Sequence, residues 1–268
     1  MISKKRCFAL ILAAIFLLSL CSCTSHEKDD LPEITIGYEN YRPYIRTDED
    51  GNPSGLDVDL AVEACRRMGY KAVFREIDWD NRDKILESGS VDCLWSCLAM
   101  DVHDDSYSWA GPYMMSRQVV AVPYDSPIRT VSDLEGKEIA VREGSKAESI
   151  FLGYAGIDVP SVQRVYCLDK TEDAVTALRN EYVDACAGYA ASLREQLELA
   201  DIEYRFLDDD LSYAKIGVAF SKDSKSGLRE KLENAFEEMY KDGTTERILK
   251  SYGVDTEKAL KGVTGDEN

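Results

Sequence analysis

Cysteines, histidines and paired acids are the side chains of this sequence with the widest chemical use, and none of them completes a catalytic or metal motif. Cys93 and Cys97 lack a second ligand pair at zinc-like spacing, and only His26 and His103 supply imidazoles. The sequence contains no Gly-x-Ser-x-Gly elbow and no phosphate-binding loop. We therefore expect no enzymatic activity, no metal ion and no cofactor.

Polar and aromatic residues at the ends of predicted elements suit solute binding. Trp95 and Ser96 end a buried strand, at the edge where open α/β sheets present their ligands. Ser145 and Lys146 follow Gly144 at a predicted helix start, where backbone amides can hold a carboxylate. Core packing of Trp95 and a plain helix cap at Ser145 are the alternatives.

Strand-like and helix-like patterns alternate along most of the chain, which predicts an α/β fold. The first series of strands and helices is predicted over 34–37, 58–68, 72–77, 79–86 and 91–95. The second series is predicted over 130–136, 138–141, 145–154, 162–167, 172–178, 183–187 and 190–199. A strand and two helices follow over 216–220, 228–240 and 244–252.

The two series predict two lobes rather than one domain. Each series has too few strands for a good sheet unless the final segments return to the first unit, so two strands near 118–122 and 214–220 should cross between them as a hinge. We expect lobe 1 to be discontinuous, over 32–121 and 213–268, and lobe 2 to cover 122–212.

The N-terminus is typical of an export signal. Basic residues at 4–6 precede an apolar run over 8–20, which is shorter than the roughly 20 residues that span a membrane. The run ends in a lipobox-like Leu-Cys-Ser-Cys, in which Cys23 is favoured for lipidation because small Ser22 precedes it. We expect a lipoprotein signal peptide over 1–23 and a tether over 24–31, with an uncleaved anchor as the alternative.

Composition limits the partners. The 268 residues include 50 acidic and 32 basic side chains, and the net charge of −18 disfavours nucleic acid and anionic lipid. Five cysteines lie outside the export segment, within apolar runs, which favours small buried residues over a disulfide framework. Without a sustained heptad pattern, we expect a monomer.

Nine short motifs occur in a consistent order along the chain. They are ITIG at 34–37, YRPY at 41–44, GNPSGLDVDL at 51–60, GSVD at 89–92, WAGPY at 109–113, DLEGK at 133–137, GS at 144–145, YVDA at 182–185 and DGT at 242–244. In this order and spacing they resemble the extracellular solute-binding proteins of family 3, the polar amino-acid receptors of ABC importers. The resemblance extends over about residues 33–252.

The resemblance implies a two-lobed clamp of the type II periplasmic-binding-protein kind, with a mixed sheet flanked by helices in each lobe and a two-strand hinge. It implies capture of a small polar solute, an amino acid or a similar molecule, and its delivery to an ABC permease and ATPase complex. The protein would work at the extracellular face of the cell membrane, held by its lipid anchor, or in a periplasm.

The resemblance also implies site residues, with two departures from the usual pattern. Tyr41 matches an aromatic residue that stacks on the solute, and Trp79 matches a pocket-lining apolar residue. His103 or Asp104 stands where an arginine usually clamps the solute carboxylate, and Tyr189 stands where an acid usually pairs with its ammonium. An aromatic or cationic solute would suit such a set. The predicted solute-binding residues are Glu39, Tyr41, Trp79, Trp95, Ser96, Cys97, His103, Ser145, Lys146 and Tyr189.

Three other functions fit the same sequence. A solute-sensing module for a signalling partner would use the same clamp, and an extracellular dehydratase-like enzyme would share the fold without the motifs named above. A surface adhesin with a vestigial site is the third alternative.

Overall fold

A computed structural model describes residues 31–102, 105–224 and 226–263. The chain divides into two units, Met1–Pro32 and Glu33–Asn268, and the fold below is that of the second unit. Within the described ranges, no helix is long and apolar enough to cross a lipid bilayer.

The first series of elements builds a parallel group of strands. Strand β1 (Glu33–Tyr38) pairs in parallel with β4 (Lys71–Glu76) and with β5 (Cys93–Ala99). Helix α2 (Leu56–Met68) connects β1 to β4 and ends at Gly69, whose left-handed conformation suits a glycine. The other elements of this series are β2 (Arg46–Thr47), β3 (Pro53–Ser54), the 3-10 turn η1 (Trp79–Asn81) and α3 (Arg82–Glu87).

The second series forms another parallel group. Strand β7 (Glu138–Arg142) lies between β8 (Arg164–Leu168) and β9 (Ala185–Tyr189) and is parallel to both. The helices of this group are η2 (Val131–Leu134), α4 (Lys146–Phe151), α5 (Thr171–Arg179) and α6 (Ala190–Leu199), and a short strand, β10 (Tyr204–Phe206), follows them.

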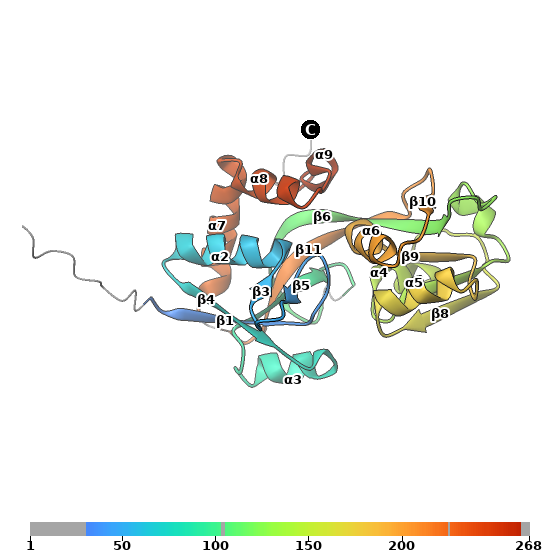
Figure 1. The fold of residues 1–268 in the computed structure, drawn as a ribbon. Coiled ribbons are helices and arrows are strands. Elements are labelled where there is room, and N and C mark those ends of the chain that lie inside the picture. The colour runs from blue at the N-terminus through green and yellow to red at the C-terminus, as the bar shows by residue number, and fades with distance from the viewer. Residues whose placement is uncertain (1–30, 103–104, 225, 264–268) are drawn as a thin grey trace, which may run out of the picture. The chain divides into compact units, whose positions relative to one another are not determined.

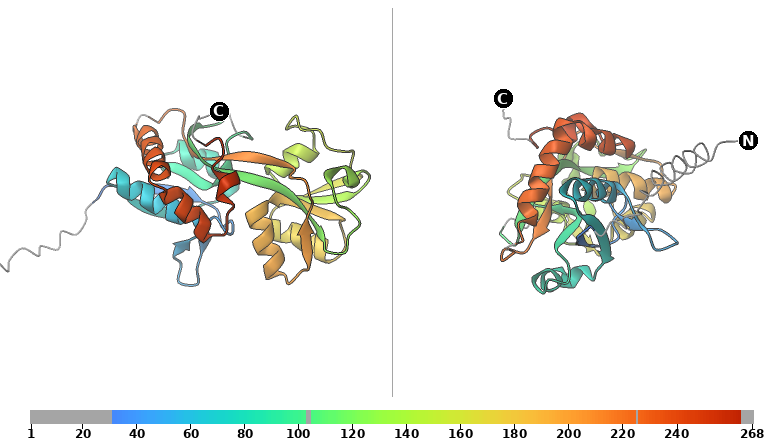
Figure 2. Two further views of the ribbon diagram at one scale, coloured as in Figure 1. Left: turned by 90° about the horizontal axis from the view of Figure 1, so that it is seen from above. Right: turned by 90° about the vertical axis from the view of Figure 1, so that its left-hand side faces the viewer.

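Two long antiparallel strands connect the groups. Strands β6 (Ser108–Pro123) and β11 (Ser212–Phe220) pair with each other, and the sheet order is β4-β1-β5-β11-β6-β9-β7-β8, with β10 beside β6. Figures 1 and 2 show β6 and β11 side by side along their course from one group to the other. Helices α7 (Leu228–Lys241), α8 (Thr244–Ser251) and α9 (Thr256–Ala259) then return to the first group.

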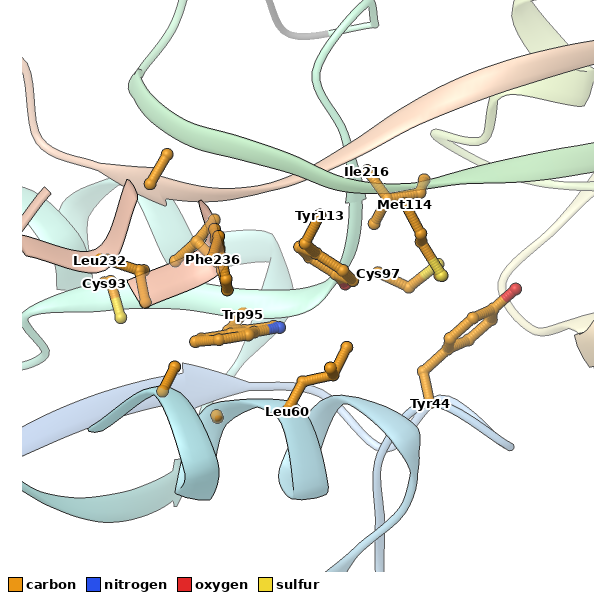
Figure 3. Close-up of a cluster of buried hydrophobic side chains, with 14 of the residues drawn as sticks. Tyr44, Leu60, Cys93, Trp95, Cys97, Tyr113, Met114, Ile216, Leu232 and Phe236 are labelled. Atoms are coloured by element: carbon orange, nitrogen blue, oxygen red, sulfur yellow. The ribbon is translucent and has the colours of Figure 1, made fainter. Parts of the chain in front are cut away.

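Each group has its own hydrophobic core, so the molecule has two lobes. In the first lobe, the Trp95 ring packs against Tyr113 and Phe236, with Leu60 and Leu232 in the same cluster (Figure 3). In the second lobe, one face of the sheet packs around Val120, Ile139 and Ile150, and the other around Val119, Val175 and Leu193.

The structure confirms the predicted α/β fold and its two crossing strands. The return of α7 and α8 to the first lobe agrees with the expected discontinuous connectivity, while the exact boundaries at 121 and 213 remain a prediction. Two predicted elements had wrong ends. The predicted crossing strand was too short, because β6 begins at Ser108 rather than near Gln118. The predicted helix over 145–154 was too long, because α4 ends at Phe151. Within the described ranges the remaining five cysteines are free thiols.

Candidate solute-binding site

The carboxyl ends of parallel strands from both lobes meet at one place. Glu39 follows β1, and Asp101 follows β5 in the first lobe, while Arg142 ends β7 and Tyr189 ends β9 in the second lobe. Open α/β sheets bind their ligands at such strand ends, because side chains and free backbone groups converge there. The site is therefore built from two sets of strand ends that face each other.

A charged pair joins the two lobes at the centre of this site. Nη2 of Arg142 lies 2.6 Å from both carboxylate oxygens of Glu39, and each side chain is less than one-fifth exposed. The guanidinium also lies over the ring of Tyr41, 4.6 Å from its centroid. Burial alone lowers the pKa of Arg142, but Glu39 and Tyr41 outweigh that effect and raise it above its ordinary value, so the side chain stays charged.

A second pair of opposite charges also spans the lobes. Nζ of Lys146 lies 2.5 Å from a carboxylate oxygen of Asp101, and the lysine side chain is buried. In both pairs the acid belongs to the first lobe and the base to the second. At these two pairs the first lobe is therefore acidic and the second basic, whereas Arg42 and Arg46 of the first lobe lie 3.6 and 3.9 Å from Glu195 of the second.

Three tyrosines pack beside these charges. The rings of Tyr41 and Tyr44 lie 5.5 Å apart, and the Tyr189 ring of the second lobe lies 6.3 and 6.0 Å from them. The Tyr44 hydroxyl makes a 3.2 Å hydrogen bond with the Ser116 hydroxyl on β6. Burial raises the pKa of Tyr41 to about 12, although the Arg142 charge opposes the shift, so the phenols are neutral hydrogen-bonding groups.

The end of β5 is held by hydrogen bonds to its neighbours. The Ser96 hydroxyl donates to the Glu39 carbonyl oxygen at 3.1 Å and accepts from the Glu39 amide at 3.4 Å, which fixes the backbone that carries Glu39. Cys97 has a left-handed conformation with φ of 50°, and its amide donates to the buried Asp57 carboxyl at 2.7 Å. These bonds position the first-lobe side of the site.

The structure brings together six of the predicted residues, which are Glu39, Tyr41, Ser96, Cys97, Lys146 and Tyr189. Ser145 adjoins them and caps α4 by accepting from the Glu148 amide at 3.2 Å. Figure 3 shows Trp95 within the core, separated from Tyr44 by Cys97 and Met114. Trp79 packs in a different cluster, with Arg82 over its ring. His103 and Cys23 lie outside the described residues.

Sequence reasoning missed Asp101, Arg142 and Tyr44. Arg142 directly follows the strand predicted over 138–141, so the strand-end rule that selected Ser96 would also have selected it. Asp101 follows β5 by two residues, just before His103, and its sequence position does not indicate a basic partner in the other lobe. For Tyr44, a tyrosine on a loop carried no signal of its burial.

The arrangement suits noncovalent binding of a small polar solute. It offers paired carboxylates, cations, phenols and backbone groups, and no group of three or more His, Cys, Asp and Glu side chains in the described ranges is placed to hold a metal ion. Buried charges of both signs favour a ligand that also carries charge, because a charge enclosed between the lobes needs an opposite charge or a hydrogen-bond partner beside it.

A two-lobed α/β fold with paired strand ends at the lobe contact is that of the type II periplasmic binding proteins. Residues 34–255 match the bacterial extracellular solute-binding proteins, family 3, and the chain belongs to this family.

Two relatives and one solved structure give the range of similarity. The Bacillus subtilis probable amino-acid-binding protein YxeM is 23% identical over 93% of this chain and 95% of its own length. The Escherichia coli histidine-binding periplasmic protein is 27% identical over 91% and 96%. An ancestral arginine-binding protein bound to arginine superimposes with a TM-score of 0.70 and 26% identity, over 82% of this chain and 97% of that one.

Proposed function

We propose that this protein captures an amino acid or a closely similar solute between its two lobes and delivers it to an ABC importer. The observation that carries the proposal is the pair of ion pairs across the lobe contact, Glu39 with Arg142 and Asp101 with Lys146. The amino acids named for the relatives support the same class of solute.

The signs of these charges favour a dipolar solute. A solute ammonium can replace the bases beside Glu39 and Asp101, and a solute carboxylate can replace the acids beside Arg142 and Lys146. A solute with a single charge satisfies only one side and leaves the opposite side chain buried without a partner, which is costly. The carboxylate of the solute would therefore face the second lobe and its ammonium the first.

The aromatic residues complete the proposed binding mode. The Arg142 guanidinium lies over the Tyr41 ring, 4.6 Å from its centroid, so the proposed carboxylate contact is bordered by an aromatic ring against which the solute can pack. The rings of Tyr44 and Tyr189 exclude water from the same place, because they are buried against Tyr41. Exclusion of water strengthens the charged contacts that select the solute.

We further propose that Cys23 carries a lipid anchor and that the mature protein works at the outer face of the cell membrane. The export signal and lipobox over 1–23 support this location, and family membership supports a permease and ATPase as partners. Deletion of the gene should abolish cellular uptake of the bound amino acid at low external concentration. Retained uptake together with a lost transcriptional response would instead indicate a sensing module.

The binding proposal is tested by thermal unfolding of the full-length chain in mild detergent against the twenty L-amino acids, cystine, polyamines and quaternary amines. An amino acid at 100 times its dissociation constant should stabilise the protein by ~2.7 kcal/mol. Arg142→Met should weaken that binding at least about tenfold, because it removes a charge-assisted contact.

The control is Arg179→Met, which removes an exposed arginine from α5 of the same lobe and should leave the affinity unchanged. Two results would overturn the proposal: the absence of stabilisation by every amino acid, or full affinity in the Arg142→Met protein. Selective stabilisation by a polyamine would show that the solute is a cation rather than a dipole.

A further inference from the structure

One row of side chains on β6 connects the cores of the two lobes. Alternate residues of a strand share a face. On one face of β6, Met114 belongs to the first core, while Val120 and Val122 belong to the second. Ser116 and Gln118 lie between them in the same row, so the row is polar only where the strand passes from one lobe to the other.

The two polar residues of this row differ in their hydrogen bonding. The Ser116 hydroxyl bonds to Tyr44. Gln118 is 0% exposed, yet neither its side-chain oxygen nor its nitrogen has a hydrogen-bond partner in the part of the chain that the structure describes. A buried, unpaired carboxamide destabilises a folded protein, because both groups lose their water without a replacement.

The register of the sheet places Gln118 at the solute-binding site. Its partner on β9 is Tyr189, and its partner on β11 is Ser212. Side chains of directly paired residues lie on the same face of a sheet. Gln118 therefore lies beside Tyr189, whose ring packs against Tyr41 and Tyr44 at the contact between the lobes.

We infer that Gln118 is a solute-recognition residue, and this inference rests on the solute-binding function proposed above. A solute lodged among the three tyrosines lies over the β6 row, where the carboxamide can donate one hydrogen bond and accept another. This role of Gln118 narrows the solute class to amino acids whose side chain carries both a hydrogen-bond donor and a hydrogen-bond acceptor. The hydrogen bonds missing within the protein are supplied by the solute.

Replacement by methionine tests this assignment, because methionine has a similar length and no hydrogen-bonding amide. Full-length wild-type, Gln118→Met and Gln163→Met proteins are compared by thermal unfolding and by calorimetric titration with L-glutamine, L-histidine, L-arginine and L-cystine. Gln163 is exposed and provides the control. We expect Gln118→Met to raise the unfolding temperature of the ligand-free protein by a few degrees and to weaken binding of the preferred amino acid about tenfold or more.

The unfolding temperature of Gln118→Met should rise while its affinity for the amino acid falls. A purely structural role of Gln118 would not produce this opposite change. Equal binding by wild-type and Gln118→Met proteins would overturn the inference, and so would a lower unfolding temperature, because the carboxamide would then be paired within the protein. If the wild-type protein binds none of the four probes or any other amino acid, the proposed function fails, and the inference fails with it. Binding by wild type with equal binding by Gln118→Met refutes the inference alone.

Discussion

The buried carboxyl of Asp57 should make the stability of the protein depend on pH in an unusual direction. Asp57 is 1% exposed and accepts hydrogen bonds from the Cys97 amide at 2.7 Å and the Tyr113 hydroxyl at 2.8 Å. Burial raises its pKa from the ordinary 3.8 to about 7, and the two hydrogen bonds only reduce that shift. At pH 5 the native carboxyl is therefore protonated, whereas the unfolded chain has released the proton.

The sign and size of the effect follow from this difference. Because the native state binds more protons than the unfolded state between about pH 4 and pH 7, its stability falls as the pH rises through that range. The contribution is fully present below pH 4 and is lost above pH 7. At ~1.4 kcal/mol for each pKa unit, wild-type protein should lose about 3 kcal/mol of unfolding free energy between pH 5 and pH 8.

Asp57→Asn should remove this pH dependence, because the amide stays neutral throughout the range. The measurement is urea unfolding at pH 5, 6, 7 and 8, followed by tryptophan fluorescence. Asp59→Asn is the matched control, since Asp59 lies on the same helix but is exposed and should leave the slope in place. A wild-type protein that is more stable at pH 8 than at pH 5, or an Asp57→Asn protein that keeps the wild-type slope, would refute the reasoning.

Substitutions at two further positions test the crossing strand and the core. Arg117→Met should lower the unfolding free energy by ~1–3 kcal/mol, measured from the urea midpoint. Arg117 Nε lies 3.0 and 3.1 Å from the two Asp210 carboxylate oxygens, and its loss leaves that half-buried carboxylate without the arginine. Equal midpoints for the two proteins would contradict this expectation. Trp95→Ala should cost ~3–5 kcal/mol, while the milder Trp95→Phe should leave amino-acid affinity unchanged in calorimetry, since the ring packs in the core; a loss of affinity in Trp95→Phe would place Trp95 in the site.

Much of the fold could be predicted because apolar periodicity is local. The strand over 138–141 and the helix over 190–199 correspond closely to β7 and α6. The first ten residues of β6 could not be predicted, because Gly111 and Pro112 within them are typical of a turn. In the structure Gly111 has a positive φ beside a register shift in the β6–β11 pairing, a tertiary arrangement that depends on a partner distant in sequence.

The site was harder to predict, because it depends on which way each side chain points. Trp95 and Ser96 are adjacent, and the sequence alone did not indicate that the tryptophan faces the core while the serine holds the Glu39 backbone. Arg142 and Asp101 acquire their role only through partners from the opposite lobe. A contact between lobes leaves no periodic signal along the chain.

The pairing of β6 with β11 also has a mechanical consequence. Residues from Ser212 to Ile216 pair one by one with residues from Gln118 to Met114, so the two strands form a hydrogen-bonded ribbon at the passage between the lobes. A ribbon of this kind bends or twists as a unit, and its ladder of hydrogen bonds stays intact as it does so. Any movement of the lobes relative to each other would therefore be restricted by this ribbon and would alter side-chain contacts between the lobes before backbone hydrogen bonds.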